Sequence, residues 1–246
     1  MYRLYFLLLL FLVPNIIFAQ WGKKQEYSFL EVSKIDIDGN DTDWDGLLMD
    51  VGDGAWSYGI CKVGNEVYVA IQVKDQLLLQ ESLHEGLFVN ISYTQKKRDG
   101  ARIDYPYWDR ERKRAFKNLD DYQDVSHYKE KMLEYVSGYL VKGFSRVRDG
   151  ILAIDNDYGI KANVSFIDNK VLFYEVKIPV ALIDLQTDKV SIQVGVNTGY
   201  SQLKRLSKHS TSGRNVYGRG ALYMKNRLKN PFSFPTDVWV TGTIKN

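Results

Sequence analysis

The sequence predicts an all-β protein, an antiparallel β-sandwich of jelly-roll-like type with a short helical insertion. Three observations predict this class. Apolar and polar residues alternate with a period of two in many short stretches, turn-forming pairs such as Gly64-Asn65 and Asp168-Asn169 separate these stretches, and helical periodicity is concentrated in one segment. Strands that follow one another without intervening helices pair antiparallel, so two stacked sheets are the expected architecture.

The first strand is expected within Ser33 to Asp45, which reads SKIDIDGNDTDWD. Ile35 and Ile37 alternate with aspartates, as in a strand with one buried face. Gly39 and the asparagine after it can adopt the backbone angles of a tight turn. Trp44 follows this turn, and we expect its indole to be buried. The segment is therefore predicted to form the first edge of the sandwich.

Eight further stretches alternate in the same way and are expected to be strands. They are residues 56–63, 66–74, 86–93, 139–147, 159–167, 170–178, 191–198 and 237–244. Residues 47–55 and 75–85 are expected to be loops, and residues 180–185 a single helical turn after Pro179. The last strand is expected to return to the edge of a sheet.

Residues 98–138 interrupt this pattern and are interpreted as an insertion packed on the sandwich. The segment begins with a compact aromatic group and continues into a highly charged run, RERKRAFKNLDDYQ. Apolar residues then recur at helical spacing between Val125 and Val136, which predicts a short amphipathic helix.

The chain has 246 residues, 45% of them hydrophobic and 26% charged, which suits one globular domain over residues 33–246. Residues 1–19 resemble a secretory signal peptide, because Arg3 precedes an apolar run and Ala19 stands at the expected cleavage site. An uncleaved membrane anchor is the alternative, although the apolar run is short for a membrane span. Residues 20–32 are interpreted as a linker. The mature protein is therefore expected to be secreted or periplasmic, with no transmembrane anchor.

Cys61 is the single cysteine, so no internal disulfide can form. It lies in a stretch that is expected to be a strand, which favours a small core residue over a nucleophile. A cysteine-poor exported chain fits the bacterial cell envelope better than an animal extracellular module.

Four segments together resemble the family 9 carbohydrate-binding modules and the wider group of DOMON-like sandwiches. They are IDIDGNDTDW at residues 35–44, EVYVAIQVKD at 66–75, LFYEVKIPVALI at 172–183 and VSIQVGVNTG at 190–199. The resemblance covers residues 33–93 and 139–244. It implies an antiparallel β-sandwich that, in sugar-binding members, holds a terminal sugar between two tryptophans.

This chain departs from the family pattern at both tryptophan positions. Before the strand GLFVNISY it has residues 81–85, ESLHE, and before the final strand it has Phe232 and Phe234. Aromatic substitutes elsewhere are therefore needed if a sugar is bound. One such set is Tyr105, Tyr107 and Trp108, because an aromatic face can pack on the C–H face of a sugar. The alternative is that these rings attach the insertion to the sheet.

Residues 189–236 form a basic arm: apart from Lys189 itself, they contain eight further Lys and Arg residues and no acidic residue. The arm is a candidate for binding an anionic partner such as a sulfated or uronic glycan, a lipopolysaccharide phosphate or a nucleic acid. Export argues against nucleic acid, and a solvated basic loop is the alternative. The candidate binding residues in this arm are Arg205, Arg214, Tyr217 and Arg219.

Two kinds of metal site are considered. Asp36, Asp38, Asn40 and Asp43 offer the hard oxygen ligands that Ca²⁺ prefers, but the EF-hand pattern fails at its sixth and twelfth positions, and aspartates on a solvent-facing strand explain the pattern as well. A DOMON-like haem module would need an axial Met and His. The candidates, none of them selected by spacing, are His84, His127, His209, Met49, Met132 and Met224.

The predicted function is binding without catalysis, because Ser207, Ser210 and Ser212 near His209 lack the context of a nucleophile elbow. The first hypothesis is a carbohydrate-binding-like module of the cell envelope or secreted fraction that recognises a glycan or polysaccharide. The second is a structural or partner-binding envelope protein that has lost the sugar site. The third is a DOMON-like haem-binding module.

Overall fold

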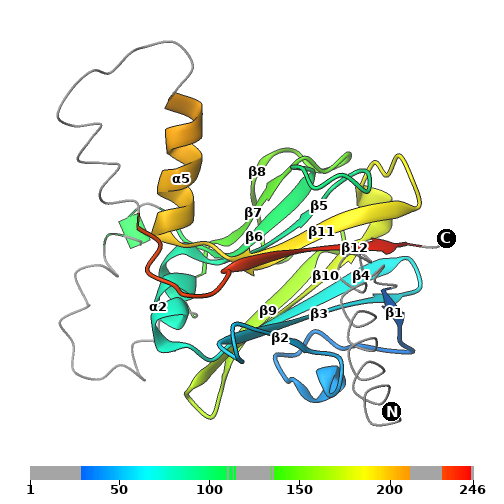
Figure 1. Ribbon diagram of the computed structural model, residues 1–246. Coiled ribbons are helices and arrows are strands. Elements are labelled where there is room, and N and C mark those ends of the chain that lie inside the picture. Colours follow the sequence, from blue (N-terminus) through cyan, green and yellow to red (C-terminus); the bar gives the residue numbers. More distant parts are fainter. Residues whose placement is uncertain are drawn as a thin grey trace, which may run out of the picture.

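The computed structural model describes residues 29–109, 111, 112, 114, 134, 136–210 and 229–244. In this part of the chain the strands form two six-stranded sheets that lie face to face (Figure 1). The predicted all-β sandwich is confirmed. None of the helices within these residues is long and apolar enough to span a membrane.

Sheet A has the strand order β1-β3-β4-β10-β9, with β2 paired to β3. Its strands are β1 (Leu30–Glu31), β2 (Met49–Val51), β3 (Trp56–Val63), β4 (Glu66–Val73), β9 (Lys161–Ile167) and β10 (Val171–Pro179). Neighbouring strands pair antiparallel except β1 and β3, which pair parallel. The turn between β9 and β10 has positive φ angles of 50° and 54° at Asp168 and Asn169, as predicted for a tight hairpin.

Sheet B has the strand order β12-β11-β5-β6-β7-β8, and all its pairings are antiparallel. Its strands are β5 (Leu87–Ile91), β6 (Ala101–Tyr107), β7 (Gly138–Lys142), β8 (Gly150–Leu152), β11 (Lys189–Val196) and β12 (Asp237–Thr243). The helical elements with described bounds are η1 (Thr42–Trp44), α2 (Gln76–Glu85), η2 (Val180–Leu182) and α5 (Gly199–Ser210). The last strand, β12, lies at a sheet edge as predicted.

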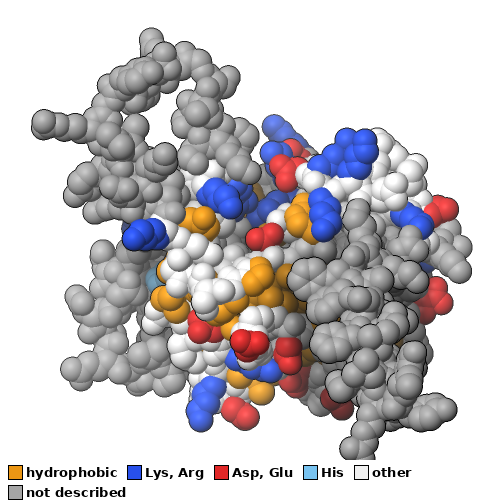
Figure 2. Space-filling view, viewed as in Figure 1, with side chains coloured by type: hydrophobic (Ala, Val, Ile, Leu, Met, Phe, Trp, Pro, Cys, Tyr) orange, Lys and Arg blue, Asp and Glu red, His pale blue; other side chains and the backbone are white. Residues whose placement is uncertain are grey.

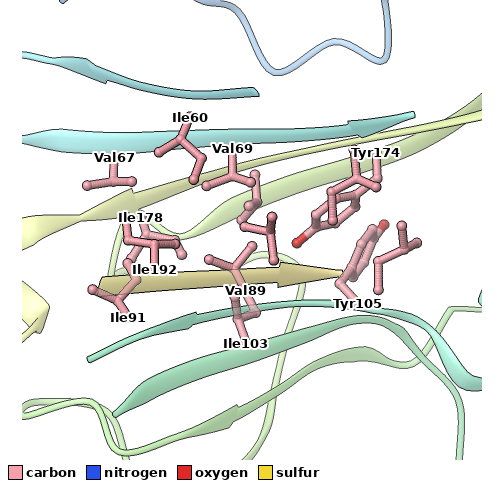
Figure 3. Packing of buried hydrophobic residues seen from close by; sticks show 14 of the residues in the cluster. Ile60, Val67, Val69, Val89, Ile91, Ile103, Tyr105, Tyr174, Ile178 and Ile192 are labelled. Carbon is pink, nitrogen blue, oxygen red and sulfur yellow. The ribbon is translucent and has the colours of Figure 1, made fainter. Parts of the chain in front are cut away.

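The core lies between the sheets, where alternate residues of each strand point inward (Figure 3). Val69 and Ile71 of β4 face Val89 of β5 and Ile192 of β11, and all four are fully buried. Burial of this kind contributes about 1.5–3 kcal/mol for each large aliphatic side chain. The period-two pattern of the sequence therefore specifies both the strands and the face that each one buries.

Residues 76–85 form helix α2 and not the predicted loop. Asp75 caps the helix, because its carboxylate accepts a hydrogen bond from the backbone N–H of Leu78 at 2.8 Å. Leu78, Leu79 and Leu83 are buried against the core. The leucines of this segment thus follow a helical repeat that covers one end of the sandwich.

Residues 101–107 are also corrected, because they form β6 in the middle of sheet B and are not part of an insertion. Ala101, Ile103 and Tyr105 point into the core, whereas Arg102 and Asp104 point away from it. The predicted amphipathic helix between residues 125 and 136 lies mostly outside the described residues.

The opening segment forms no regular strand between residues 32 and 48. We call these residues the cover segment, since they lie on the face of sheet A that points away from sheet B (Figure 1, blue). Ile35 and Trp44 are buried as predicted, in a small second core with Cys61 and Phe173. The alternation of apolar residues therefore reports burial of one side of the segment and not strand pairing.

Glu175 of β10 holds the cover segment in place. Its carboxylate accepts hydrogen bonds from the backbone N–H of Gly39 at 2.5 Å and from the indole N–H of Trp44 at 3.3 Å. The hydroxyl of Ser165 donates to the carbonyl of Gly39 at 2.6 Å. Burial raises the pKa of the Glu175 carboxyl, although the N–H groups of Gly39 and Trp44 act in the opposite direction.

Candidate functional site

The outer face of sheet B differs from the outer face of sheet A. The cover segment buries an apolar layer on sheet A. On sheet B the outward-pointing positions of β6 and β11 carry polar side chains, and α5 follows at the end of β11 (Figure 1). Lys and Arg side chains gather over sheet B in the view of Figure 2, with fewer acidic side chains between them. This face is therefore the candidate binding surface.

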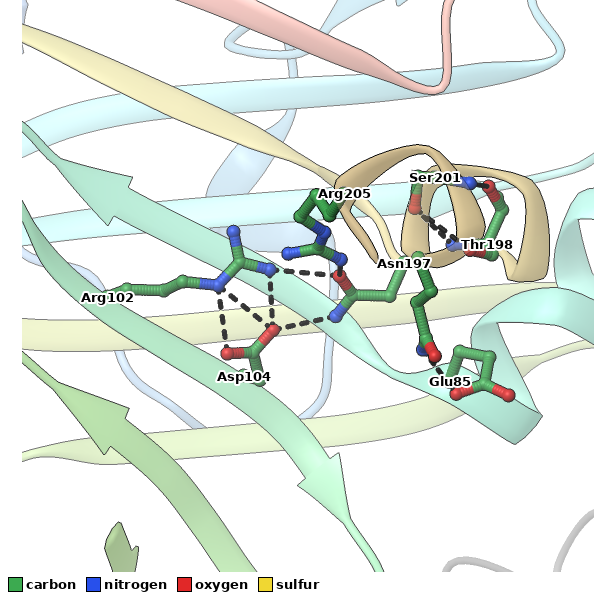
Figure 4. A network of polar contacts seen from close by, with 8 residues as sticks. Glu85, Arg102, Asp104, Asn197, Thr198, Ser201 and Arg205 are labelled. Atoms are coloured by element: carbon green, nitrogen blue, oxygen red, sulfur yellow. Dashed lines mark hydrogen bonds and ion pairs between the residues drawn. The ribbon is translucent and has the colours of Figure 1, made fainter. Parts of the chain in front are cut away.

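Arg102 and Asp104 form the centre of a polar network on this face (Figure 4). They lie two residues apart on β6, so both side chains point outward from the same strand. The guanidinium of Arg102 donates to the Asp104 carboxylate from Nη2 at 2.7 Å and from Nε at 3.0 Å. Each side chain keeps 17% of its surface exposed, so the pair is held in place and still reaches solvent.

Asn197 and Arg205 join this pair from the other side of the network (Figure 4). The amide of Asn197, just after β11, donates to Asp104 at 2.7 Å and accepts from Nη2 of Arg102 at 2.9 Å. Its oxygen also accepts from Nη2 of Arg205, a residue of α5, at 3.0 Å. Two guanidinium groups thus converge on one amide oxygen.

Hydrogen bonds fix the start of α5 and so position Arg205. Thr198 and Ser201 make a reciprocal cap, in which each side-chain hydroxyl accepts the backbone N–H of the other residue at 3.0 Å. Glu81 of α2 accepts the backbone N–H of Gly199 at 2.8 Å, and Glu85 accepts the amide N–H of Gln202. The two helices therefore support one another at the end of sheet B where the network lies.

The electrostatic surroundings of Arg205 match this geometry. Partial burial lowers the pKa of its guanidinium, and the nearby Arg102 lowers it further. Asp104, Asp99 and Asp237 act in the opposite direction. Two like charges are thus brought close together, with three acidic groups near them.

Aromatic rings lie beside the network. The guanidinium carbon of Arg102 is 3.9 Å from the ring centre of Phe88, which stabilises and orients the cation.

The strand register places five residues in one row across β12, β11, β5, β6 and β7, namely Trp239, Gln193, Asn90, Arg102 and Lys142. At a strand spacing of about 4.8 Å such a row is roughly 19 Å long. Trp239 is half-buried at one end of it.

No family model matches this chain, and no curated protein matches it in sequence. Solved structures that are similar to it include the following two. Both are described as a family 9 carbohydrate-binding module from Caldicellulosiruptor kristjanssonii, one in complex with cellotriose and the other with glucose. The first is 9% identical with a TM-score of 0.37 over 70% of this chain and 77% of its own. The second is 8% identical with a TM-score of 0.37 over 70% and 78%.

The two positions where sugar-binding members of this family are expected to have tryptophan lie at the end of the sandwich that carries α2. Residues 81–85 are the last half of α2, where Glu81 and Glu85 bind α5. Phe232 is buried in the core, and the ring of Phe234 packs against it at 5.6 Å between centres and over Gly52. These side chains hold the fold together at places where the resemblance implies a sugar clamp.

The predicted aromatic platform at residues 105–108 is corrected. Tyr105 and Trp108 are 6% and 1% exposed and belong to the main core. The ring of Tyr105 lies 5.0 Å from that of Tyr139. Because Tyr105 is an inward-pointing residue of β6, its ring cannot stack on a ligand outside the sandwich. Tyr107 is half-buried at the end of the same strand.

Of the predicted basic residues, Arg205 lies in the network. Arg214, Tyr217 and Arg219 lie outside the described residues, so their part in a site stays a prediction. The residues that sequence reasoning missed are Arg102, Asp104 and Asn197. The signal was present in the alternation of ARIDY at residues 101–105, which marks Arg102 and Asp104 as outward-pointing neighbours on one strand.

The predicted calcium ligands bind the backbone of their own segment. Asp38 accepts the N–H of Asn40 at 2.8 Å, Asn40 accepts that of Thr42 at 3.2 Å, and Asp43 accepts that of Asp36 at 2.9 Å. The carboxylate of Asp36 pairs with Lys34. Within the described ranges no three His, Cys, Asp or Glu side chains are grouped to hold a metal ion. Asn40 and Asp43 thus bond the backbone of a turn, as the alternative interpretation had it, but the aspartates do not lie on a strand.

Few of the candidate axial ligands of the haem hypothesis lie in the described part of the chain. Met49 lies in β2 of sheet A, and His84 lies in the last turn of α2. His127, Met132 and Met224 and the side chain of His209 lie outside the described part of the chain.

Proposed function

We propose that this protein is a non-catalytic carbohydrate-binding domain, and that the ligand binds on the outer face of sheet B beside α5. The observation that supports this proposal is the network of Arg102, Asp104, Asn197 and Arg205. Planar amide, guanidinium and carboxylate groups in fixed positions suit the hydroxyl groups of sugars, which both donate and accept hydrogen bonds. A half-buried ring such as Trp239 offers an apolar face for sugar C–H groups.

Among the described residues, the outer face of sheet B carries polar side chains and no apolar layer like the one that the cover segment buries on sheet A. Such a prearranged polar surface loses little conformational entropy when a ligand binds. Together with the proposed signal peptide at residues 1–19, this favours an exported envelope or secreted protein that recognises a glycan outside the cytoplasm.

Binding of the mature chain to an array of polysaccharides, followed by calorimetric titration of the best ligand, tests the proposal. We expect Asn197→Ala to weaken binding at least about tenfold, because its amide joins all three charged side chains of the network. The control is Asn65→Ala, an exposed residue in the turn between β3 and β4 of the other sheet. Thermal unfolding of both variants shows whether each is folded. No bound polysaccharide, or equal binding by a folded Asn197→Ala, contradicts the proposal.

A second candidate function, binding of a protein partner, is favoured by the other edge of sheet B. Ile151 of the edge strand β8 is 60% exposed, and Ile154 and Tyr158 after it are 48% and 41% exposed. Exposed apolar side chains beside an open strand edge are a common feature of docking surfaces. A photo-cross-linker at position 151 should capture a discrete protein in cells, and one at exposed Lys161 of β9 should not. Equal cross-linked products from positions 151 and 161, or no product from either position, count against this function.

A further inference from the structure

We infer that the network on sheet B is selective for a sugar that carries an oxyanion, a carboxylate or a sulfate group. This inference rests on the proposed function and narrows its ligand class. The observation behind it is the balance of hydrogen-bond donors and acceptors in the network.

Most acceptors of the network are already occupied. Oδ1 of Asp104 accepts from Nε and Nη2 of Arg102 and from the amide of Asn197, and Oδ2 accepts from Nε of Arg102. The amide oxygen of Asn197 accepts from Nη2 of Arg102 and Nη2 of Arg205. A carboxylate or amide oxygen has about two lone pairs, so the remaining accepting capacity is one lone pair on Oδ2 of Asp104.

Donors remain in excess. Among the described residues, Nη1 of Arg102 and both Nε and Nη1 of Arg205 have no hydrogen-bond partner. Arg102 is held by Asp104 and Phe88, and the exposed Arg205 is oriented by its hydrogen bond to Asn197. The network therefore offers a ligand more free donors than free acceptors.

The charge of the network leads to the same ligand class. Two guanidinium groups share one amide oxygen, and Asp104 is the only carboxylate hydrogen-bonded to them among the described residues. Asp99 and Asp237 lie near enough to act on Arg205 through their charge, but no hydrogen bond joins them to either guanidinium group among the described residues. A ligand oxyanion would relieve the repulsion between the two cations, and the fork of N–H groups matches a carboxylate or sulfate.

A neutral glycan lacks this advantage. Its hydroxyl groups can accept from the free N–H groups, but each also brings an O–H donor, and Oδ2 of Asp104 is the one acceptor of the network with a free lone pair. An oxyanion brings no donor, adds charge attraction, and can accept two parallel N–H bonds from a guanidinium group. We therefore expect the oxyanion to decide the choice of ligand, and the sugar ring to contribute through contacts along the sheet.

The test uses titration of the full mature chain with polygalacturonate, with its carboxyl-reduced neutral form and with dextran sulfate. We expect polygalacturonate or dextran sulfate to bind at least about tenfold more tightly than the neutral polymer, and this preference to shrink as salt rises. Binding of polygalacturonate alone assigns the carboxylate, and binding of dextran sulfate alone assigns the sulfate. Arg205→Gln should remove most of the preference, whereas Arg205→Lys should keep part of it, because lysine retains the charge without the planar fork.

The control variant is Lys161→Gln, which removes an exposed cation from β9 on the other sheet and should keep the preference. Arg205 is chosen before Arg102 because Arg102 packs on Phe88 and its loss could disturb the sheet. If neutral polysaccharides bind as tightly as charged ones and Asn197→Ala still weakens this binding, the inference fails and the proposed function stands. If Lys161→Gln lowers the preference as much as Arg205→Gln, net charge and not the network is responsible, and the inference also fails. If no polysaccharide of any charge binds, both fail.

Discussion

The hydroxyl of Tyr174 is a polar group enclosed in the core of the sandwich. The side chain is 0% exposed, and the hydroxyl has no hydrogen-bond partner among the described residues. It lies next to Tyr105, whose ring centre is 6.0 Å away (Figure 3). Tyr139, in the same cluster, differs because its hydroxyl accepts the backbone N–H of Ala162 at 3.2 Å.

This difference predicts opposite effects of the same substitution. Tyr174→Phe should leave the free energy of unfolding unchanged or raise it by up to about 1 kcal/mol, because it removes an unpaired polar group. Tyr139→Phe should lower it by roughly 1 kcal/mol, because the N–H of Ala162 loses its acceptor. Urea unfolding of both variants measures these values. A loss of more than about 1 kcal/mol in Tyr174→Phe would show that this hydroxyl is hydrogen-bonded in solution.

Glu175 gives the protein a specific pH dependence. Because burial raises its pKa in the folded state, the folded protein holds the proton more firmly than the unfolded chain does. The contribution to stability is then complete below the unfolded-state pKa of about 4.3 and is lost as pH rises through the folded-state pKa. We expect wild type to lose stability relative to Glu175→Gln as pH rises from about 4.3.

Chemical unfolding at a series of pH values measures this difference curve, in which the contributions of the other titrating groups cancel. Glu31→Gln, which changes an exposed carboxylate of β1, is the matched variant measured beside it. A flat curve for Glu175→Gln would show that the hydrogen bonds from Gly39 and Trp44 fully offset the burial of the carboxyl.

Comparison of two glycines near β2 distinguishes the effect of backbone strain from the effect of crowding. Gly52 and Gly54 both have positive φ angles, 62° and 83°, which side chains of L-residues disfavour. At Gly54 an added Cβ would meet no atom within 4 Å, whereas at Gly52 it would lie 2.5 Å from Cβ of Phe234. Gly52 therefore lets the segment before β12 pack closely on the end of sheet A.

We expect Gly54→Ala to lower the free energy of unfolding by roughly 1–2 kcal/mol, the usual penalty of a left-handed residue. Gly52→Ala should lower it by about 3 kcal/mol or more, since crowding adds to the same strain. Urea unfolding measures both values. Similar losses in the two variants would mean that Phe234 moves aside easily.

The strands and helices also show which parts of the fold can be predicted from sequence patterns. The hairpins of β3 with β4 and of β9 with β10 were predictable, because short turns separate stretches with clear alternation. Helix α2 was missed because its four leucines include Leu77, which is 46% exposed and obscures the helical repeat. Strand β6 was missed because Pro106 and three aromatic residues at 105–108 resemble a loop. The network could not be predicted, since it joins β6 to residues almost one hundred positions later.

At the scale of the whole molecule, Cys61 reports which part of the protein opens first. It is buried under the cover segment and not between the sheets, and burial raises the pKa of its thiol to about 12. It reacts as a thiolate, so a thiol reagent must wait for an opening of the structure. Because the cover segment has the smaller core, we expect it to detach before the sandwich unfolds.

The free energy of opening that governs labelling of Cys61 should then be smaller than the global free energy of unfolding. Trp44→Ala, which removes the largest side chain that covers this region, should accelerate labelling at least about tenfold with a smaller effect on unfolding of the sheets. Labelling kinetics with a thiol reagent, compared with urea unfolding followed by circular dichroism, measure both. Identical free energies from the two methods would show that cover segment and sandwich open together.

The hydrogen bonds of the cover segment also constrain the order in which a growing polypeptide can complete its fold. Gly39 is bound by Glu175, 136 residues later in the chain, and by Ser165, 126 residues later. While a ribosome is still making the first two thirds of the protein, the cover segment lacks the side chains of Ser165 and Glu175, which later bind Gly39. The small second core likewise lacks Phe173 until β10 has been synthesised, so closure of this face is a late step of folding.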